Sequence, residues 1–304
     1  MEYTIKAIKS HFYENFMNVL VGGTGFIGTA LAEKLIQQGE RVICIARTIP
    51  EQKIDGVVYH AVDILSNSDQ IAPILSQGAC VYLLNGQNSA SFDATSELEG
   101  FKRVLNVVRA SGPSKVLFAS TALAYGECSE AANENQSLAP RDSYAQYKVS
   151  CESVIQEELS NIPVGILRLG NVYGSERNRG FIGLALKKIS EASEIQLNGD
   201  GLQESDYVFL DDVVSAMIAV RDGLKESDVI NIVTGKSVTL LGVIALLSDV
   251  VGRSIPFSVT GVPVMESQII RVDNTKLREK YGFVPRIFLK EGLRKTLDRY
   301  KIEF

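Results

Sequence analysis

Three glycines at three-residue spacing follow an apolar run near the start of the chain. Residues 19–21 (VLV) lead into Gly22, Gly25 and Gly28. In a strand–turn–helix unit the first glycine permits the sharp turn. The second lets backbone N–H groups approach a pyrophosphate, and the third lets the helix pack closely on the strand. The pattern predicts a dinucleotide site, with an ordinary strand-to-helix turn as the alternative. The residues expected to bind the dinucleotide here are Gly22, Thr24, Gly25, Phe26, Ile27 and Gly28.

The residues after this turn continue the same unit. Residues 26–38 place apolar side chains at helical spacing, and Gly39 follows where a left-handed C-terminal cap is expected. A second apolar strand is predicted over 41–47. Together these segments predict a βαβ unit.

Two charged residues bear on which dinucleotide is bound. The carboxylate that usually binds the adenosine ribose is missing at the end of the second strand, where Ala46 and Arg47 stand. An arginine can pair with a 2′-phosphate, which favours NADP over NAD, and a solvated loop position is the alternative. Asp63, at the end of a third short strand over 60–64, and Ile64 after it are placed to meet the adenine. A helix N-cap or turn is the other role considered for Asp63.

Composition excludes several classes of protein. The 304 residues are 45% hydrophobic and 22% charged with a formal net charge of −5, which supports one large core plus a smaller lobe and argues against a nucleic-acid surface. The four cysteines and two histidines show no metal-ligand spacing, so we predict no metal and free thiols in a reducing cytoplasm. No apolar run approaches bilayer length, so no membrane association is predicted.

Strands and helices alternate along most of the chain. Strands are predicted over 79–84, 115–119 and 163–168, and helices over 96–111 and 143–160. This alternation predicts an α/β Rossmann fold, a doubly wound parallel sheet, with a smaller C-terminal α/β substrate lobe. The expected divisions are an N-terminal extension over 1–16, a dinucleotide-binding domain over 17–170 with segments around 205–235 returning to it, and a substrate lobe over 171–204 and 236–304.

A tyrosine and a lysine four residues apart carry the predicted chemistry. Tyr144 and Lys148 share one face of a helix, and an ammonium beside a phenol favours the phenolate. Bringing a phenol from a pKa near 10 to near neutrality requires on the order of 4 kcal/mol. Thr121 ends a strand, which is the usual place for a ligand-facing residue in an open α/β sheet. The alternative is a packed tyrosine with a solvated lysine.

With these residues in view, the chain resembles the extended short-chain dehydrogenase/reductase superfamily, in particular its nucleotide-sugar epimerase and reductase group. The supporting segments are the glycine turn, the Ser120-Thr121 strand end, Tyr144 with Lys148, and residues 167–174, 199–208 and 231–235. The resemblance implies hydride transfer between a sugar carbon, C4, and a nicotinamide. Tyr144 is then the acid/base, and Lys148 lowers the pKa of Tyr144 and holds the nicotinamide ribose.

The resemblance also implies the substrate contacts. Thr121 orients the substrate oxygen, and Ser120 and Asn171 contact the substrate, with a turn-forming role as the alternative for Asn171. A cytoplasmic homodimer acting on a nucleotide sugar is implied in the same way.

Three segments depart from the family pattern. Ser205 stands where nucleotide-diphosphate sites usually have an arginine, and Arg271 from the C-terminal lobe is the replacement that we consider. The strand end 84–86 reads LNG in place of small residues, and the helix start 97–101 reads ELEGF in place of NVxGT.

The absence of proton-transfer groups at two positions argues against two of the family's reactions. Ala122 and Leu123 cannot serve as the acid and base that sugar dehydratases require, and Leu123 also replaces the cysteine of the epimerase/reductases that act beside a keto group. A C4 epimerase that retains NAD and a ketoreductase that consumes NADPH remain open. Reduction of a non-nucleotide ketone or aldehyde is a further alternative, as is a non-catalytic NADP-sensing protein.

Overall fold

A computed structural model describes residues 17–86, 92–175, 180–261 and 269–300. The predicted extension over 1–16 lies outside these ranges. The chain forms two compact units, each assembled from several segments. Of the described residues, the first unit takes in 17–86, 92–120, 142–167 and 220–229, and the second takes in 121–141, 168–175, 180–219, 230–261 and 269–300.

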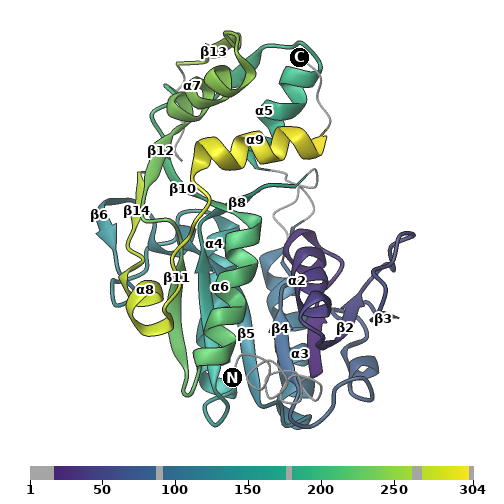
Figure 1. Cartoon of the computed structure of the whole chain (residues 1–304). Helices are drawn as coiled ribbons and strands as arrows, with labels where there is room; N and C mark the ends of the chain where they lie inside the picture. The colour runs from purple at the N-terminus through teal and green to yellow at the C-terminus, as the bar shows by residue number, and fades with distance from the viewer. Residues whose placement is uncertain (1–16, 87–91, 176–179, 262–268, 301–304) are drawn as a thin grey trace, which may run out of the picture. The chain divides into compact units, whose positions relative to one another are not determined.

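The main sheet has seven strands in the order β11-β7-β5-β4-β1-β2-β3 (Figure 1). The pairings of β1 with β2 and β4, of β2 with β3, and of β4 with β5 are all parallel. The predicted doubly wound parallel sheet is therefore confirmed. The strands are β1 (Met17–Val21), β2 (Arg41–Ala46), β3 (Val57–Ala61), β4 (Cys80–Leu83), β5 (Lys115–Thr121), β7 (Val164–Leu169) and β11 (Asp228–Ile232).

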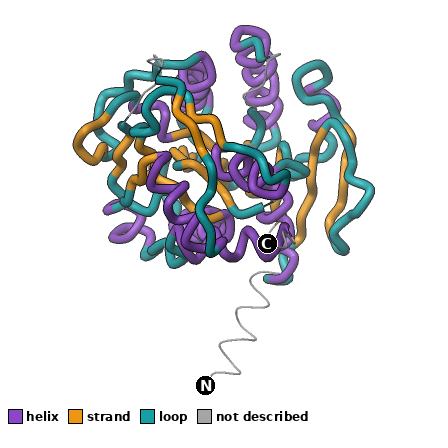
Figure 2. Tube along the Cα trace, turned by 90° about the horizontal axis from the view of Figure 1, so that it is seen from above, coloured by secondary structure: helices purple, strands orange, loops and turns teal. Residues whose placement is uncertain are grey.

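Helices cover the strands and bury their side chains. All four residues of β4 are buried, as expected for a parallel strand covered on both faces. Val19 and Val21 of β1 share a core cluster with Phe101 and Ile155, which come from two different helices. Figure 2 shows helices running alongside the strands. These helices are α2 (Phe26–Gln37), α3 (Ala94–Ala110), α4 (Ser143–Glu158) and α6 (Leu210–Gly223).

The predicted elements agree with the structure except at the third strand. The predicted end of that strand at 60–64 is wrong, because β3 ends at Ala61 and Asp63 lies in the following turn. β3 is the edge strand of the sheet and its burial pattern is irregular, so its apolar residues mark its end poorly. Gly39 adopts the expected left-handed conformation after α2, with φ +80°.

The second unit has three small sheets and its own apolar core. The sheets are ordered β12-β10-β8, β13-β9 and β14-β6. Its strands are β6 (Cys128–Ala132), β8 (Asn171–Tyr173), β9 (Ile195–Leu197), β10 (Glu204–Phe209), β12 (Ser237–Thr239), β13 (Phe257–Val259) and β14 (Ile270–Val272). Its helices are α5 (Phe181–Ser190), α7 (Leu240–Val251), α8 (Thr275–Tyr281) and α9 (Leu289–Tyr300), and residues 210–219 of α6 also belong to it.

The division of the chain differs from the predicted one at four segments. Residues 121–141, 168–170, 205–219 and 230–235 belong to the second unit, whereas they are predicted to belong to the dinucleotide-binding domain. Three of the five crossings between the units fall inside strands, after Ser120 in β5, Leu167 in β7 and Val229 in β11. A strand has one continuous hydrophobic pattern, so the sequence does not mark a division inside it.

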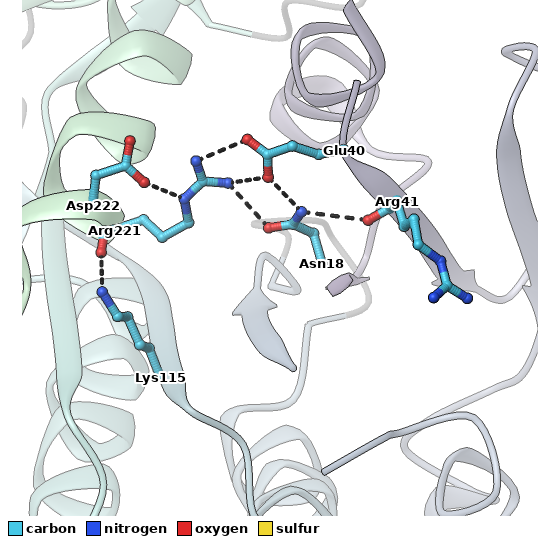
Figure 3. A network of polar contacts seen from close by, with 6 residues as sticks. All are labelled: Asn18, Glu40, Arg41, Lys115, Arg221 and Asp222. Atoms are coloured by element: carbon cyan, nitrogen blue, oxygen red, sulfur yellow. Dashed lines mark hydrogen bonds and ion pairs between the residues drawn. The ribbon is translucent and has the colours of Figure 1, made fainter. Parts of the chain in front are cut away.

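A buried ion-pair network ties α6 to the sheet of the first unit (Figure 3). Arg221 donates to both carboxylate oxygens of Glu40, at 2.6 and 2.9 Å, and to Asn18 Oδ1 at 3.2 Å. Asn18 Nδ2 donates in turn to Glu40 at 2.8 Å, and Lys115 Nζ donates to the Arg221 carbonyl at 2.6 Å. The Arg221 and Glu40 side chains are 2% and 0% exposed, so Arg221 is the buried counter-charge of Glu40. Arg221 Nε also pairs with Asp222, at 2.7 Å, whose side chain is 46% exposed.

Removing one partner of this pair should cost far more stability than removing both. We expect Glu40→Leu to lower the free energy of unfolding by about 3–5 kcal/mol, because Arg221 loses its fully buried counter-charge and both hydrogen bonds to it. Adding Arg221→Met should recover much of that loss. Urea unfolding of the two single variants and the double variant measures the coupling, and additive losses would contradict it.

Candidate functional site

The glycine turn forms a cradle at the start of α2. Gly22 has φ +87°, which other residues rarely adopt, and its N–H donates to Ile45 O at 2.8 Å. A Cβ at Gly28 would lie 2.7 Å from Gly22 O, so only glycine allows this close approach. Gly25 caps α2 without a side-chain hydrogen bond, which leaves the N–H groups of the first helical turn to an anion. Phe26 and Ile27 begin that turn.

A cavity of about 260 Å³ opens beside this cradle in the first unit. Six of the predicted dinucleotide-binding residues line it: Gly22, Thr24, Gly25, Arg47, Asp63 and Ile64. Phe26, Ile27 and Gly28 are not among the lining residues. Asn85, Gly86 and Glu97 line the cavity as well, at positions that the sequence marks only as departures from a family pattern.

The residues around the cavity fit a dinucleotide. Both polar atoms of the Asn85 side chain are buried with no hydrogen-bond partner among the described residues, so they have donor and acceptor capacity left for a ligand. A Cβ at Gly22 would lie 3.1 Å from Asn85 N, so the cradle and the end of β4 are in close contact. The glycine turn would hold the pyrophosphate. Arg47 after β2 and Asp63 and Ile64 after β3 would hold the adenosine half.

The charges on the cavity wall partly cancel. Arg47 is exposed, and Asp63 accepts hydrogen bonds from Leu65 N at 3.3 Å and Ser66 Oγ at 3.1 Å. These bonds match the turn role considered for Asp63. Burial raises the pKa of Glu97, and the nearby Arg47 opposes that shift. The wall therefore carries acidic groups that reduce the pull of Arg47 on an extra phosphate.

Helix α4 brings Tyr144 and Lys148 to the carboxyl ends of β4 and β5. Asp142 caps α4, accepting from Ala145 N at 2.7 Å, which sets where the helix begins. Lys148 is 2% exposed, and its Nζ donates to the carbonyls of Ala119 at 2.7 Å and Asn85 at 3.0 Å. Nζ also lies 5.8 Å from the centre of the Tyr144 ring.

Gly86 makes room for this lysine. A Cβ at position 86 would lie 2.9 Å from Lys148 Nζ. The backbone there has φ +120°, which also favours glycine. The departure at residues 84–86 thus places a glycine where the ammonium reaches the wall of the cavity.

Burial dominates the titration of both side chains. It lowers the pKa of Lys148 to about 8 and raises the pKa of Tyr144 to about 12. The phenol shift is opposite to the one that we predict for a catalytic base, because burial disfavours the charged phenolate and nearby Asp142 adds to the shift. A lower phenol pKa therefore requires a further positive charge, which an oxidised nicotinamide carries.

Ser120 has a protein partner. Its hydroxyl is buried and donates to the carboxylate of Glu152, which is itself 3% exposed. The oxygen of this hydroxyl can still accept a hydrogen bond, so the substrate contact that the resemblance implies for Ser120 stays a prediction. The sequence analysis leaves out Glu152, although its place four residues after Lys148 could have suggested a charge on the same helix face.

Thr121 and Asn171 meet at a small cavity in the second unit. Both line it together with Leu123, Ser205 and Ile270. Thr121 is 7% exposed, and its Oγ1 accepts from Leu123 N at 3.2 Å, which leaves the hydroxyl proton available to donate. The walls combine apolar side chains with a few hydroxyl and amide groups.

Arg271 has its charge countered within the second unit. It donates to both carboxylate oxygens of Glu204, at 2.8 and 2.9 Å, and to Ser129 O at 2.8 Å. Neither Arg271 nor Glu204 lines the cavity that holds Thr121, Asn171 and Ser205. Contact between Arg271 and a diphosphate stays a prediction, and it requires the bond to Glu204 to open.

Three further features concern metal binding, cysteines and membrane-spanning helices. Among the described residues, no group of three or more His, Cys, Asp and Glu side chains is placed to hold a metal ion. All four cysteines are buried and free, as predicted. No described helix has the length and apolar character needed to span a membrane.

Comparisons with known proteins agree on one family. The family model described as NAD dependent epimerase/dehydratase family matches residues 19–233. A dTDP-6-deoxy-L-talose 4-dehydrogenase (NAD(P)(+)) of Kitasatospora kifunensis is 27% identical over 90% of this chain and 92% of its own length. A UDP-glucose 4-epimerase of Mycolicibacterium smegmatis is 24% identical over 93% of this chain and 98% of its own.

A solved structure extends the agreement to three dimensions. The UDP-glucose 4-epimerase of Thermotoga maritima, solved with UDP-glucose, is 26% identical and superposes with a TM-score of 0.84 over 94% of this chain and 99% of that one. The expected superfamily resemblance and the expected dependence on NAD(P) are thereby confirmed. This chain belongs to the NAD-dependent epimerase/dehydratase family and is an NAD(P)-dependent enzyme.

Proposed function

We propose that this chain catalyses redox chemistry at one carbon, C4, of a nucleotide-diphosphate sugar, as an epimerase or a ketoreductase. The observation that carries the proposal is the buried Lys148 ammonium. It lies 5.8 Å from the Tyr144 ring and bonds to Asn85 O on the wall of the dinucleotide cavity. The relatives named for UDP-glucose 4-epimerisation and for 4-dehydrogenation of a dTDP-sugar support C4 as the reacting carbon.

In the proposed mechanism the residues of this chain move a proton. When bound, a nicotinamide would supply hydride exchange with the sugar carbon. The Tyr144 phenolate takes the proton of the hydroxyl on that carbon and returns it in the reverse direction. Lys148 holds the nicotinamide ribose and stabilises the phenolate. The Thr121 hydroxyl donates a hydrogen bond to the same sugar oxygen. Asn171 contacts the sugar.

The residues after Thr121 limit the reaction to redox chemistry. Ala122 and Leu123 form the start of a short helix and carry no group that transfers protons. Elimination of water from the sugar therefore has no acid or base at these positions. Arg47 on the cavity wall leaves NADP as well as NAD open, so both the epimerase and the reductase remain within the proposal.

A second candidate follows from the missing arginine. Ser205 stands at its position, and the charge of Arg271 is taken up by Glu204. A diphosphate would lack the bidentate partner that such groups usually receive. Reduction of a non-nucleotide ketone or aldehyde by NADPH is the function that this observation favours.

Replacing Tyr144 by Phe should abolish turnover and leave cofactor binding nearly intact. The variant removes only the hydroxyl that moves the proton, a step worth about 10²- to 10⁴-fold in rate. Turnover and the dissociation constant for NAD or NADP are the two measurements. Tyr147→Phe is the matched control, because it removes a buried hydroxyl from the same helix at a position with no role in the proposed mechanism. An active Tyr144→Phe enzyme would remove Tyr144 from the mechanism.

The pH profile should report the charge of Lys148. Its pKa is lowered to about 8, so the ammonium is present below that pH and is lost as the pH rises through it. We therefore expect kcat/KM to fall on the alkaline side with an apparent pKa near this value. A profile that stays flat well above pH 8, up to the ordinary lysine range, would show that the charge is not required.

A thermal-shift panel separates the two candidate substrates. NAD or NADP should raise the melting temperature, and one of the UDP-, dTDP-, GDP- or CDP-sugars should raise it further when cofactor is present. A ligand at about 100 times its Kd adds about 2.7 kcal/mol to the stability of the folded state. If a cofactor shifts the melting temperature and no nucleotide sugar does, the proposal fails in favour of the non-nucleotide reductase.

A further inference from the structure

Lys148 is a buried cation without a direct counter-ion. It is 2% exposed, it forms none of the described ion pairs within 4 Å, and its Nζ is bonded only to the carbonyls of Ala119 and Asn85. Carbonyl dipoles solvate an ammonium but do not cancel its charge, and an uncompensated buried charge is costly. A nearby negative group must therefore favour the protonated form if the lysine is to act as a cation.

The titratable groups that face Lys148 come from two helices. Tyr144, Tyr147, Cys151 and Glu152 lie on α4, and Glu97 lies on α3. β5 and the end of β4 contribute only carbonyl groups and an aromatic ring. Burial raises the pKa values of the two phenols and of the Cys151 thiol far above neutrality, so these three groups are uncharged near pH 7. Glu152 and Glu97 are the remaining sources of negative charge.

Of these two carboxylates, Glu152 is the more deeply buried. It is 3% exposed and lies one helical turn after Lys148, so the two side chains share a face of α4. Glu97 is only partly buried on the cavity wall, where solvent screens it. The field of Glu152 at Lys148 acts through protein interior and is weakened less.

Ser120 holds this carboxylate in place. Its hydroxyl, at the end of β5, donates to Glu152, while the carbonyl of the preceding residue, Ala119, accepts from Lys148. Two neighbouring residues of one strand thus bind the two charges of α4 separately. The carboxylate is kept from closing into a contact ion pair, so the lysine hydrogens remain available for a ribose.

We propose that Glu152, anchored by Ser120, is a positioning residue whose buried charge keeps Lys148 protonated without capturing its ammonium group. The inference rests on the proposed function only for the use to which that ammonium is put. A contact pair would hold Nζ on the carboxylate, whereas a counter-charge held nearby stabilises the cation and leaves its donors free. In the mechanism, Glu152 acts only through Lys148.

The test is the titration of Lys148 in the full-length protein, followed by NMR of lysine labelled with ¹³C at the ε carbon. The Lys148 resonance is assigned by its loss in Lys148→Arg. Glu152→Gln keeps the shape of the side chain and an acceptor for Ser120, so it removes only the charge. We expect it to lower the pKa of Lys148 by about one unit. Glu157→Gln, an exposed carboxylate on the same helix, is the matched control and should leave that pKa unchanged.

Ser120→Ala separates charge from packing, because it removes one hydrogen bond to the Glu152 carboxylate and keeps both charges. We expect no fall in the Lys148 pKa in this variant, because the carboxylate charge is kept. We also expect weaker cofactor binding, because the loss of this hydrogen bond lets the carboxylate shift toward Nζ. An unchanged Lys148 pKa in Glu152→Gln would overturn the proposal. A fall in Ser120→Ala as large as that in Glu152→Gln would also overturn it, by assigning the effect to packing.

These measurements need neither substrate nor turnover. A lower Lys148 pKa in Glu152→Gln, together with the absence of any activity on nucleotide sugars, would contradict the proposed function alone. An unchanged Lys148 pKa in an active enzyme would contradict the role of Glu152 alone. If the proposed function and the role of Glu152 are both correct, the alkaline limb of the pH–activity profile should move to lower pH in Glu152→Gln. The size of that move should equal the fall in the Lys148 pKa.

Discussion

The burial of one ammonium group, that of Lys148, constrains the residues around the dinucleotide cavity of the first unit. Lys148 lies where the carboxyl ends of β4 and β5 meet, and it draws on backbone carbonyls from both. The loop beside it has glycine at residue 86, where φ is +120° and a Cβ would lie 2.9 Å from Nζ. The buried ammonium requires a negative group inside the protein, which Glu152 supplies. The sheet, the loop after β4 and helix α4 are thus coupled through one charge.

Sequence reasoning predicts this half well because its signals are local. The spacing of Gly22, Gly25 and Gly28 reflects a turn and a helix contact within ten residues, and the pairing of Tyr144 with Lys148 reflects one helix face. Both kinds of constraint act between near neighbours in the chain. A single sequence therefore carries them without information about the tertiary structure.

The partners that the sequence does not predict are distant in the chain. Ser120 is bonded to Glu152, 32 residues away, and Arg221 is bonded to Glu40, 181 residues away. Nothing in the local pattern of either residue indicates its partner. The same holds for the Tyr144 pKa, because its direction depends on how much apolar protein surrounds the phenol. Desolvation is a property of the packed structure and leaves no motif.

The key charged side chains are buried in the first unit and partly exposed in the second. This difference bears on how each unit would hold its ligand. In the first unit the charges of Arg221, Glu40 and Lys148 are buried, so they are fixed in place and costly to disturb. In the second unit the Arg271 side chain is 43% exposed and its pair with Glu204 is partly screened by solvent. Exposed pairs of this kind contribute little to stability, so an anionic ligand could displace Glu204 at small cost. Fixed charges in the first unit suit a cofactor that is bound in the same way at every turnover. The exposed Arg271–Glu204 pair in the second unit suits a ligand that binds and leaves at each turnover.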